Sequence, residues 1–256
     1  MDPDYILIRD HARRLVKASP LPDFYKSQAE VNHLSRDFYQ NNPIIRMLKK
    51  QISTLMDDNL GHGLHHAEKV SQDAGALILI VCRRQSFSGD KTDRMLLMSQ
   101  CAGLLHDIKR KQKNHALASA EYASTLLTDY SFSQKEITDI CQAIRNHEAF
   151  KENCGVFSET GQILSNCLYD ADKFRWGPDN FTHTVWDMVA NARIPLSVFM
   201  SHFPRGLETV GRVRTTFRSE PGQQYGPQFI DIGMDIGNKL YLMIKSEFPS
   251  AFDCTI

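Results

Sequence analysis

The sequence predicts an all-α fold, because apolar residues recur at helical spacing and almost nowhere alternate as they would in a strand. No stretch sustains a period of two, so an appreciable β-sheet is not expected. Short loops rich in Gly, Asn, Asp and Lys separate the helical segments. The expected loops are residues 58–63, 86–91, 109–114, 148–158 and 177–180.

The helical segments can be followed in order along the chain. Residues 1–58 are expected to form N-terminal helices that precede the central ones, and one of them is expected over 43–56. The apolar positions of 66–81 step by three or four, residues 93–106 are apolar on most sides, and 115–128 carry a stripe of small residues. Ser133 and Glu136 form a capping-box pattern at the start of the next helix. Residues 160–174 again have apolar positions at helical spacing. Two C-terminal helices are expected over 195–217 and 228–247, separated by Pro221 and Gly222.

Length and composition suit a globular protein. The 256 residues include 42% hydrophobic and 23% charged side chains, enough to bury a sizeable core without a structural metal. Lys plus Arg and Asp plus Glu both number 30, and this balance argues against stable binding of nucleic acid or of an anionic membrane. The longest apolar run, residues 74–82, is too short to span a membrane, and the first residues carry no signal-peptide pattern. Six cysteines without a C-x-x-C pair are typical of a reduced protein, so a cytoplasmic location is expected.

The chemistry-bearing residues lie at the ends of apolar helices. His106 and Asp107 close the segment over 93–106 directly after Leu104 and Leu105. Burial of an imidazole beside a carboxylate costs free energy unless the two are paired or bind a cation. Taken alone, the pair could equally be a capping aspartate beside a hydrogen-bonded histidine.

Two further residues favour cation binding over the capping alternative. His66 begins an earlier helix and Asp172 lies near the end of a later one, so three helices could bring both to the His106–Asp107 pair. Two imidazoles and two carboxylates suit Mn, Fe, Co, Ni or Mg, and Zn less distinctively.

This order, H(x39)HD(x64)D, with Leu-Leu before the His-Asp pair and Ala-Asp-Lys at the last aspartate, resembles the HD-domain superfamily. The Gly-His-x-x-x-His run at 61–66 is similar to a variant found in small phosphohydrolases of that family. The resemblance covers about residues 58–190 and implies a helical HD bundle with His66, His106, Asp107 and Asp172 as metal ligands. His66 is preferred to His65 because Val70 matches the apolar position four residues after the first ligand. On this reading residues 1–57 are N-terminal helices, 58–190 the HD core and 191–256 a C-terminal extension, all expected to form one compact domain.

His115 and His147 are the next candidates. In dinuclear members of the family, histidines at these places hold a second metal, so the resemblance implies one or two divalent ions per chain. Alternatively they bind the substrate phosphate or orient a water, or they are solvated groups at helix ends. His62, between two glycines, is a candidate substrate-binding residue, with a plain turn residue as the alternative.

Several cations near the ligands could meet an anion. Arg110 stands where the family often has Lys, and Lys173 and Arg175 follow Asp172. Each could contact a phosphate, and a surface ion pair is the alternative reading for each. Trp176 is expected to pack under a loop, with stacking on a base as the other reading. Of Arg212, Arg214 and Arg218, most are expected at the surface, with one reaching the site.

The resemblance implies a metal-dependent phosphohydrolase that acts on a nucleotide or another small phosphoester through a metal-activated water. Asp107 would be a ligand and also orient that water, while His115, His147, Arg110 and Lys173 would stabilise charge on the phosphate. A di-iron oxygenase of the HD type and a non-catalytic nucleotide-binding module remain alternatives. No G-x-S-x-G elbow or Walker loop is present, which disfavours serine hydrolases and P-loop enzymes. Neither the exact substrate nor the oligomeric state follows from the sequence.

Overall fold

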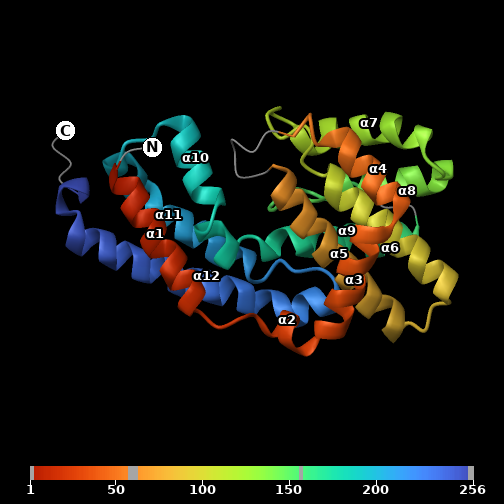
Figure 1. Ribbon diagram of the computed structural model, residues 1–256, viewed down its shortest axis with the longest axis horizontal. Helices are drawn as coiled ribbons and strands as arrows, with labels where there is room; N and C mark the ends of the chain where they lie inside the picture. The colour runs from red at the N-terminus through yellow and green to blue at the C-terminus, as the bar shows by residue number, and fades with distance from the viewer. Residues whose placement is uncertain (1–2, 57–62, 156–157, 253–256) are drawn as a thin grey trace.

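The computed structural model describes residues 3–56, 63–155 and 158–252, and in these residues every regular element is a helix (Figure 1). The all-α prediction is therefore confirmed. The molecule is elongated, with the longest helix, α12 (Glu220–Glu247), running along it from one end towards the other (Figure 1). None of the described helices is both long enough and apolar enough to cross a lipid bilayer.

One end of the molecule is a bundle built around α5. Its helices are α3 (Ala29–Asn41), α4 (Pro43–Ile52), α5 (Leu64–Arg84), α6 (Gly89–Leu105), α7 (His115–Leu126), α8 (Gln134–Arg145) and α9 (Glu159–Phe174). α5 packs on α3, α6 and α9, and it is apolar nearly all round from Ala74 to Cys82, as a central helix must be. α6 is equally buried from Met95 to Leu105. The chemistry-bearing helix ends thus emerge from the most completely buried part of the protein.

A second hydrophobic cluster lies at the other end of the molecule (Figure 1). It joins α1 (Pro3–Ala18), α10 (Thr184–Ala192), α11 (Leu196–Val213) and the C-terminal half of α12. Trp186 of α10 is its largest fully buried side chain, and its indole nitrogen donates to the carbonyl of Phe181. The first and last helices therefore pack on each other, while α2 (Asp23–Ser27) connects α1 to the bundle. The division of the chain at residues 57 and 190 stays a prediction.

Most helix positions agree with the periodicity, and one C-terminal boundary was wrong. The capping box at Ser133 and Glu136 is present as expected. Pro221 and Gly222, however, do not separate two helices, because α12 already begins at Glu220. Proline is tolerated in the first turn, where its missing N–H has no intrahelical partner, and the Ser219 side chain caps the helix by accepting from the Gly222 amide.

The start of α12 is anchored to α9 through Asp170. This fully buried carboxylate accepts hydrogen bonds from the backbone amides of Arg218 and Ser219 at 2.8 and 2.7 Å, and from the Ser219 hydroxyl at 2.6 Å. Burial nevertheless raises the pKa of Asp170 to about 6. A Cβ atom on Gly222 would lie 1.9 Å from an Asp170 oxygen, so only glycine allows this close approach. Asp170 is two residues before Asp172, and the contact therefore ties the C-terminal helix to the candidate site.

Candidate functional site

His106 lies directly after α6 and is fully buried. Its Nδ1 is 2.7 Å from the carbonyl oxygen of Gly103 in the last turn of the helix. This contact assigns the ring proton to Nδ1 and leaves the lone pair of Nε2 directed into the site. Burial lowers the pKa of His106 to about 3, although the neighbouring carboxylates of Asp107 and Asp172 oppose the shift. The ring is therefore neutral near pH 7, which is the form that binds a metal.

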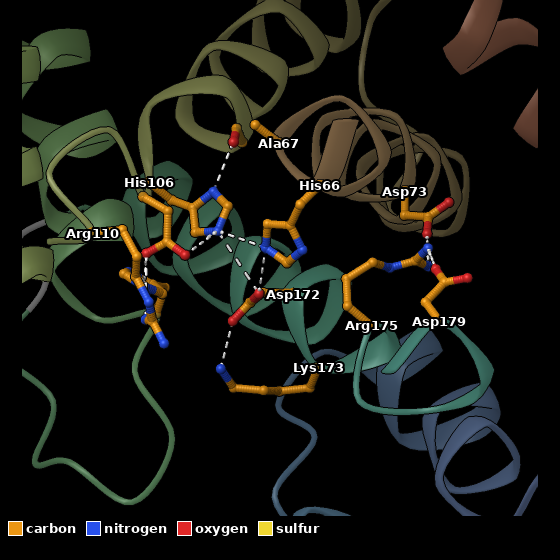
Figure 2. Close-up of polar contacts among 12 residues, drawn as sticks. His66, Ala67, Asp73, His106, Arg110, Asp172, Lys173, Arg175 and Asp179 are labelled. Atoms are coloured by element: carbon orange, nitrogen blue, oxygen red, sulfur yellow. Dashed lines mark hydrogen bonds and ion pairs between the residues drawn. The ribbon is translucent and has the colours of Figure 1, made fainter. Parts of the chain in front are cut away.

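His66 and Asp172 meet His106 from two other helices. His66 is the third residue of α5 and Asp172 lies near the end of α9. His66 Nε2 is 3.2 Å from His106 Nε2, and the Oδ1 atom of Asp172 is 3.3 Å from the first nitrogen and 3.7 Å from the second. The three groups point to one place (Figure 2). His65 is exposed instead, with its ring near that of His183, so only the second histidine of the pair is turned inward.

Asp107 lies between this group and two further histidines. Its Oδ2 atom is 3.6 Å from His106 Nε2, while Oδ1 is 3.3 Å from His115 Nε2 and 3.4 Å from His147 Nε2. His115 is the first residue of α7, and His147 follows α8, where its Nδ1 is held by the Ile144 carbonyl at 2.6 Å. All six residues predicted as ligands, or as a second ligand pair, are therefore buried within one connected cluster.

Arg110 places a positive charge beside the His115 end of this cluster. Its guanidinium NH1 is 2.8 Å from His115 Nε2 and 3.6 Å from Asp107 Oδ1 (Figure 2 shows Arg110 beside the cluster). Burial and then the Arg110 charge lower the pKa of His115, while Asp107 raises it. A neutral His115 can accept a hydrogen bond from the guanidinium at this nitrogen.

Lys173 supplies the second cation, and it is buried. Its Nζ atom donates to Asp172 Oδ2 at 2.5 Å, and the ammonium lies near the rings of Tyr169 and Trp176. Burial opposes ionisation of Asp172, but the charge of Lys173 and the hydrogen bond from His66 hold its pKa well below the usual range. Asp172 therefore offers an ionised oxygen to the site.

The donor atoms fit a divalent ion. Ligand atoms of an ion with bonds of about 2.1 Å are themselves separated by about 3 to 3.5 Å. The nitrogens of His66 and His106 and the Asp172 oxygen have separations of 3.2, 3.3 and 3.7 Å. A second group consists of His106, Asp107 and His147. Each offers one ligand atom, and these three atoms lie within 4.8 Å of one another. The neutral imidazole of His106 beside the ionised carboxylate of Asp172 belongs to the kind of donor set that a divalent cation stabilises.

The cluster forms part of the wall of a cavity of about 340 Å³. Polar and charged residues from the cluster line one part of it. The remainder is lined by residues of the loop after α8, the turn after α9, and helices α10 and α11, namely Glu148, Ala149, Phe150, Arg175, Trp176, Asn180, Thr184, Met188, Thr209 and Val210. The cavity is large enough for a small organic phosphoester.

Arg175 also lines the cavity, but carboxylates within the fold pair with its charge. It is buried and forms ion pairs with Asp73 and Asp179, towards which its guanidinium points in Figure 2. The same guanidinium donates to the Tyr25 hydroxyl at 2.7 Å. Two carboxylates outside the cluster pair with its charge, whereas Lys173 and Arg110 each contact a carboxylate of the cluster itself.

The expectations for Trp176, for the C-terminal arginines and for His62 have different outcomes. Trp176 packs partly against the core and also lines the cavity. Arg212 and Arg214 are exposed, whereas Arg218 is half-buried and donates to the carbonyl of Asn146, the residue before His147, at 2.8 Å. His62 lies outside the described residues, so its role as a substrate-binding residue stays a prediction.

The sequence analysis missed Phe150 and Met188, both of which are exposed and line the cavity. The signal for Phe150 was its place three residues after His147, just past a helix that ends at the site. Met188 carried no signal, because only the packing of α10 brings it to the cavity.

No family model and no curated protein matches this sequence. One similar solved structure is that of a predicted HD superfamily hydrolase from an uncultured Thermotogales bacterium. The two chains are 22% identical, the superposition covers 85% of this chain and 95% of that one, and the TM-score is 0.43.

Proposed function

We propose that this protein is a metal-dependent phosphohydrolase of the HD type that acts on a nucleotide or another small phosphoester. The observation that carries the proposal is the convergence of His66 Nε2, His106 Nε2 and Asp172 Oδ1 within 3.7 Å of one another. They lie beside a cavity whose wall includes the cations Arg110 and Lys173. His66, His106, Asp107 and Asp172 would hold the ion. When bound there, a divalent metal supplies Lewis acidity and lowers the pKa of water.

The remaining residues of the cavity have roles that follow from their own contacts. Lys173 and Arg110 would hold the phosphate, because each is a cation at the edge of the carboxylate cluster. Asp107, between His106 and His147, would orient the attacking water. His115 and His147, whose Nε2 atoms face the cluster, would take up or pass a proton near the phosphate oxygens. These charges are in place before the substrate binds, which is the arrangement that stabilises developing negative charge at low reorganisation cost.

We further propose one metal ion per chain. The donors that would make up a second site are Asp107 Oδ1 and the Nε2 atoms of His115 and His147. The guanidinium of Arg110 approaches two of these donors, at 2.8 Å from His115 and 3.6 Å from Asp107. A positive group in this place opposes a second cation by charge repulsion and supports a phosphate instead.

The test is hydrolysis of a panel of nucleotides and simple phosphomonoesters with Mn, Co, Ni and Mg. We expect phosphate release with at least one metal and its loss in His106→Ala and Asp107→Ala. His33→Ala is a matched control, since this histidine is exposed on α3. No release with any metal, or full activity in the two site variants, contradicts the proposal.

Two other outcomes would identify the alternatives. Two irons per chain together with oxygen consumption would support a di-iron oxygenase of the HD type. Tight nucleotide binding without turnover would support a non-catalytic binding module.

A further inference from the structure

Phe150 is an unusual residue in the wall of the cavity. It lies in the loop after α8, three residues beyond His147, and 46% of its surface is exposed. Among the residues that the structure describes, it is the one aromatic ring in the group of exposed large hydrophobic side chains. Exposure of a ring costs free energy that a packed position would avoid.

The backbone of Phe150 is also unfavourable. Its φ angle is +61°, a conformation that bulky residues rarely adopt because the Cβ atom crowds the backbone. Such positions cluster at ligand-binding sites, where the surroundings hold a side chain in a useful place.

Arg212 supports the ring from α11. Its guanidinium carbon is 4.6 Å from the centre of the Phe150 ring, a cation–π distance. The same helix contributes Thr209 and Val210 to the cavity wall. The ring is therefore held between α11 and the cavity, although its side chain is not buried.

The cavity has two chemically different parts. Lys173, Arg110 and the carboxylate–histidine cluster make one part charged, whereas Phe150, Trp176, Met188 and Val210 supply apolar surface. A ligand that fits both has an anionic end and a flat apolar end. Stacking of an aromatic ring on an exposed side-chain ring is the interaction that such a wall offers.

We propose that Phe150, supported by Arg212, selects phosphoesters whose alcohol carries a flat aromatic ring. The inference rests on the proposed function and adds the class of leaving group. Phe150 is the residue that contacts the ring, and Arg212 is a positioning residue.

The experiment compares benzyl phosphate with cyclohexylmethyl phosphate. Both release a primary alcohol and have similar size and equal charge, so their difference is the flat aromatic ring. The readout is the ratio of kcat/KM for the two esters, measured in the wild type, Phe150→Leu, Phe150→Tyr and Arg212→Gln. Leu keeps a Cβ atom and apolar volume but removes the ring, and Tyr restores the ring.

We expect the wild type to prefer the benzyl ester and Phe150→Leu to lower the ratio by about tenfold, as for loss of one stacking partner. Phe150→Tyr retains the preference, and Arg212→Gln gives a smaller loss in the same direction. Leu242→Ala, a change at a 65% exposed residue of α12, is the control and leaves the ratio as in the wild type. Hydrolysis of both esters with a ratio that Phe150→Leu does not change overturns the inference while the proposed function stands.

Calorimetric binding of benzylphosphonate and cyclohexylmethylphosphonate separates the two ideas if neither ester is hydrolysed. These analogues need no turnover. A wild-type preference for the benzyl compound that Phe150→Leu removes supports the aromatic wall even without hydrolysis. Equal binding of the two compounds by the wild type overturns it.

Discussion

The Nε2 atoms of His66 and His106 lie 3.2 Å apart, although the two residues come from different helices and both are buried. The Gly103 carbonyl assigns the proton of His106 to its other nitrogen, so a lone pair of His106 is directed at His66. The ionised oxygen of Asp172 completes the group. A shared cation is the partner that satisfies all three atoms at once.

We therefore expect a divalent metal to stabilise the wild type and not His106→Ala. At about a hundredfold excess over Kd, a ligand adds about 2.7 kcal/mol to the free energy of unfolding, which for a chain of this size raises Tm by about 5 °C or more. The measurement is Tm with Mn, Co or Ni against Tm with a chelator, compared within each variant so that a lower baseline does not matter. His33→Ala serves as the control and keeps the shift. A wild type whose Tm responds to none of the metals would refute the site.

Elemental analysis tests the number of metals. We expect about one equivalent per chain in the wild type. His115→Ala should keep this equivalent and lose most of its phosphatase activity, because His115 and Arg110 act on the substrate in our proposal. Two equivalents in the wild type that fall to one in His115→Ala would instead show that His115 is a ligand of a second ion.

The pairing of Arg175 predicts a role in stability. Replacement by Met leaves Asp73 buried without its cation, and loss of one partner from a buried pair costs about 3–5 kcal/mol. Burial already raises the pKa of Asp73 against the opposing effect of Arg175, so the carboxyl is expected to take up a proton in the variant. The free energy of unfolding from denaturant titration is the measurement.

Arg214→Gln is the matched control, because Arg214 pairs with Asp231 while both side chains are about half exposed. Surface pairs of this kind contribute about 0–1 kcal/mol. Equal effects of the Arg175 and Arg214 substitutions would contradict a structural role for Arg175.

A second stability test compares two glycines in helices. Gly222→Ala places a Cβ atom 1.9 Å from an Asp170 oxygen that already accepts two hydrogen bonds, so we expect a loss of about 2 kcal/mol or more in the free energy of unfolding. Gly206→Ala on α11 meets open space and should gain up to about 1 kcal/mol from helix propensity. Thermal unfolding followed by circular dichroism distinguishes them. A neutral Gly222→Ala would show that the junction of α9 and α12 adapts easily.

The sequence by itself determined the helical class, the order of the helices and the capping box at Ser133. These depend on spacings of three and four residues, which are local and can be read along the chain. It also indicated which polar residues lie at helix ends, and the resemblance of their order to the HD-domain pattern named His66, His106, Asp107 and Asp172 as a group. The start of α12 was misplaced because a proline in a first turn and a proline between helices look alike in sequence.

Only the tertiary structure decided between neighbours that look equivalent in sequence. Lys173 and Arg175 both follow Asp172 and both line the cavity, but residues two apart on a helix point in nearly opposite directions, so Lys173 pairs with Asp172 and Arg175 with Asp73. Phe150 and Met188 became part of the cavity through the packing of a loop and a helix from distant parts of the chain. Such contacts depend on which surfaces exclude water together, and no local pattern encodes that.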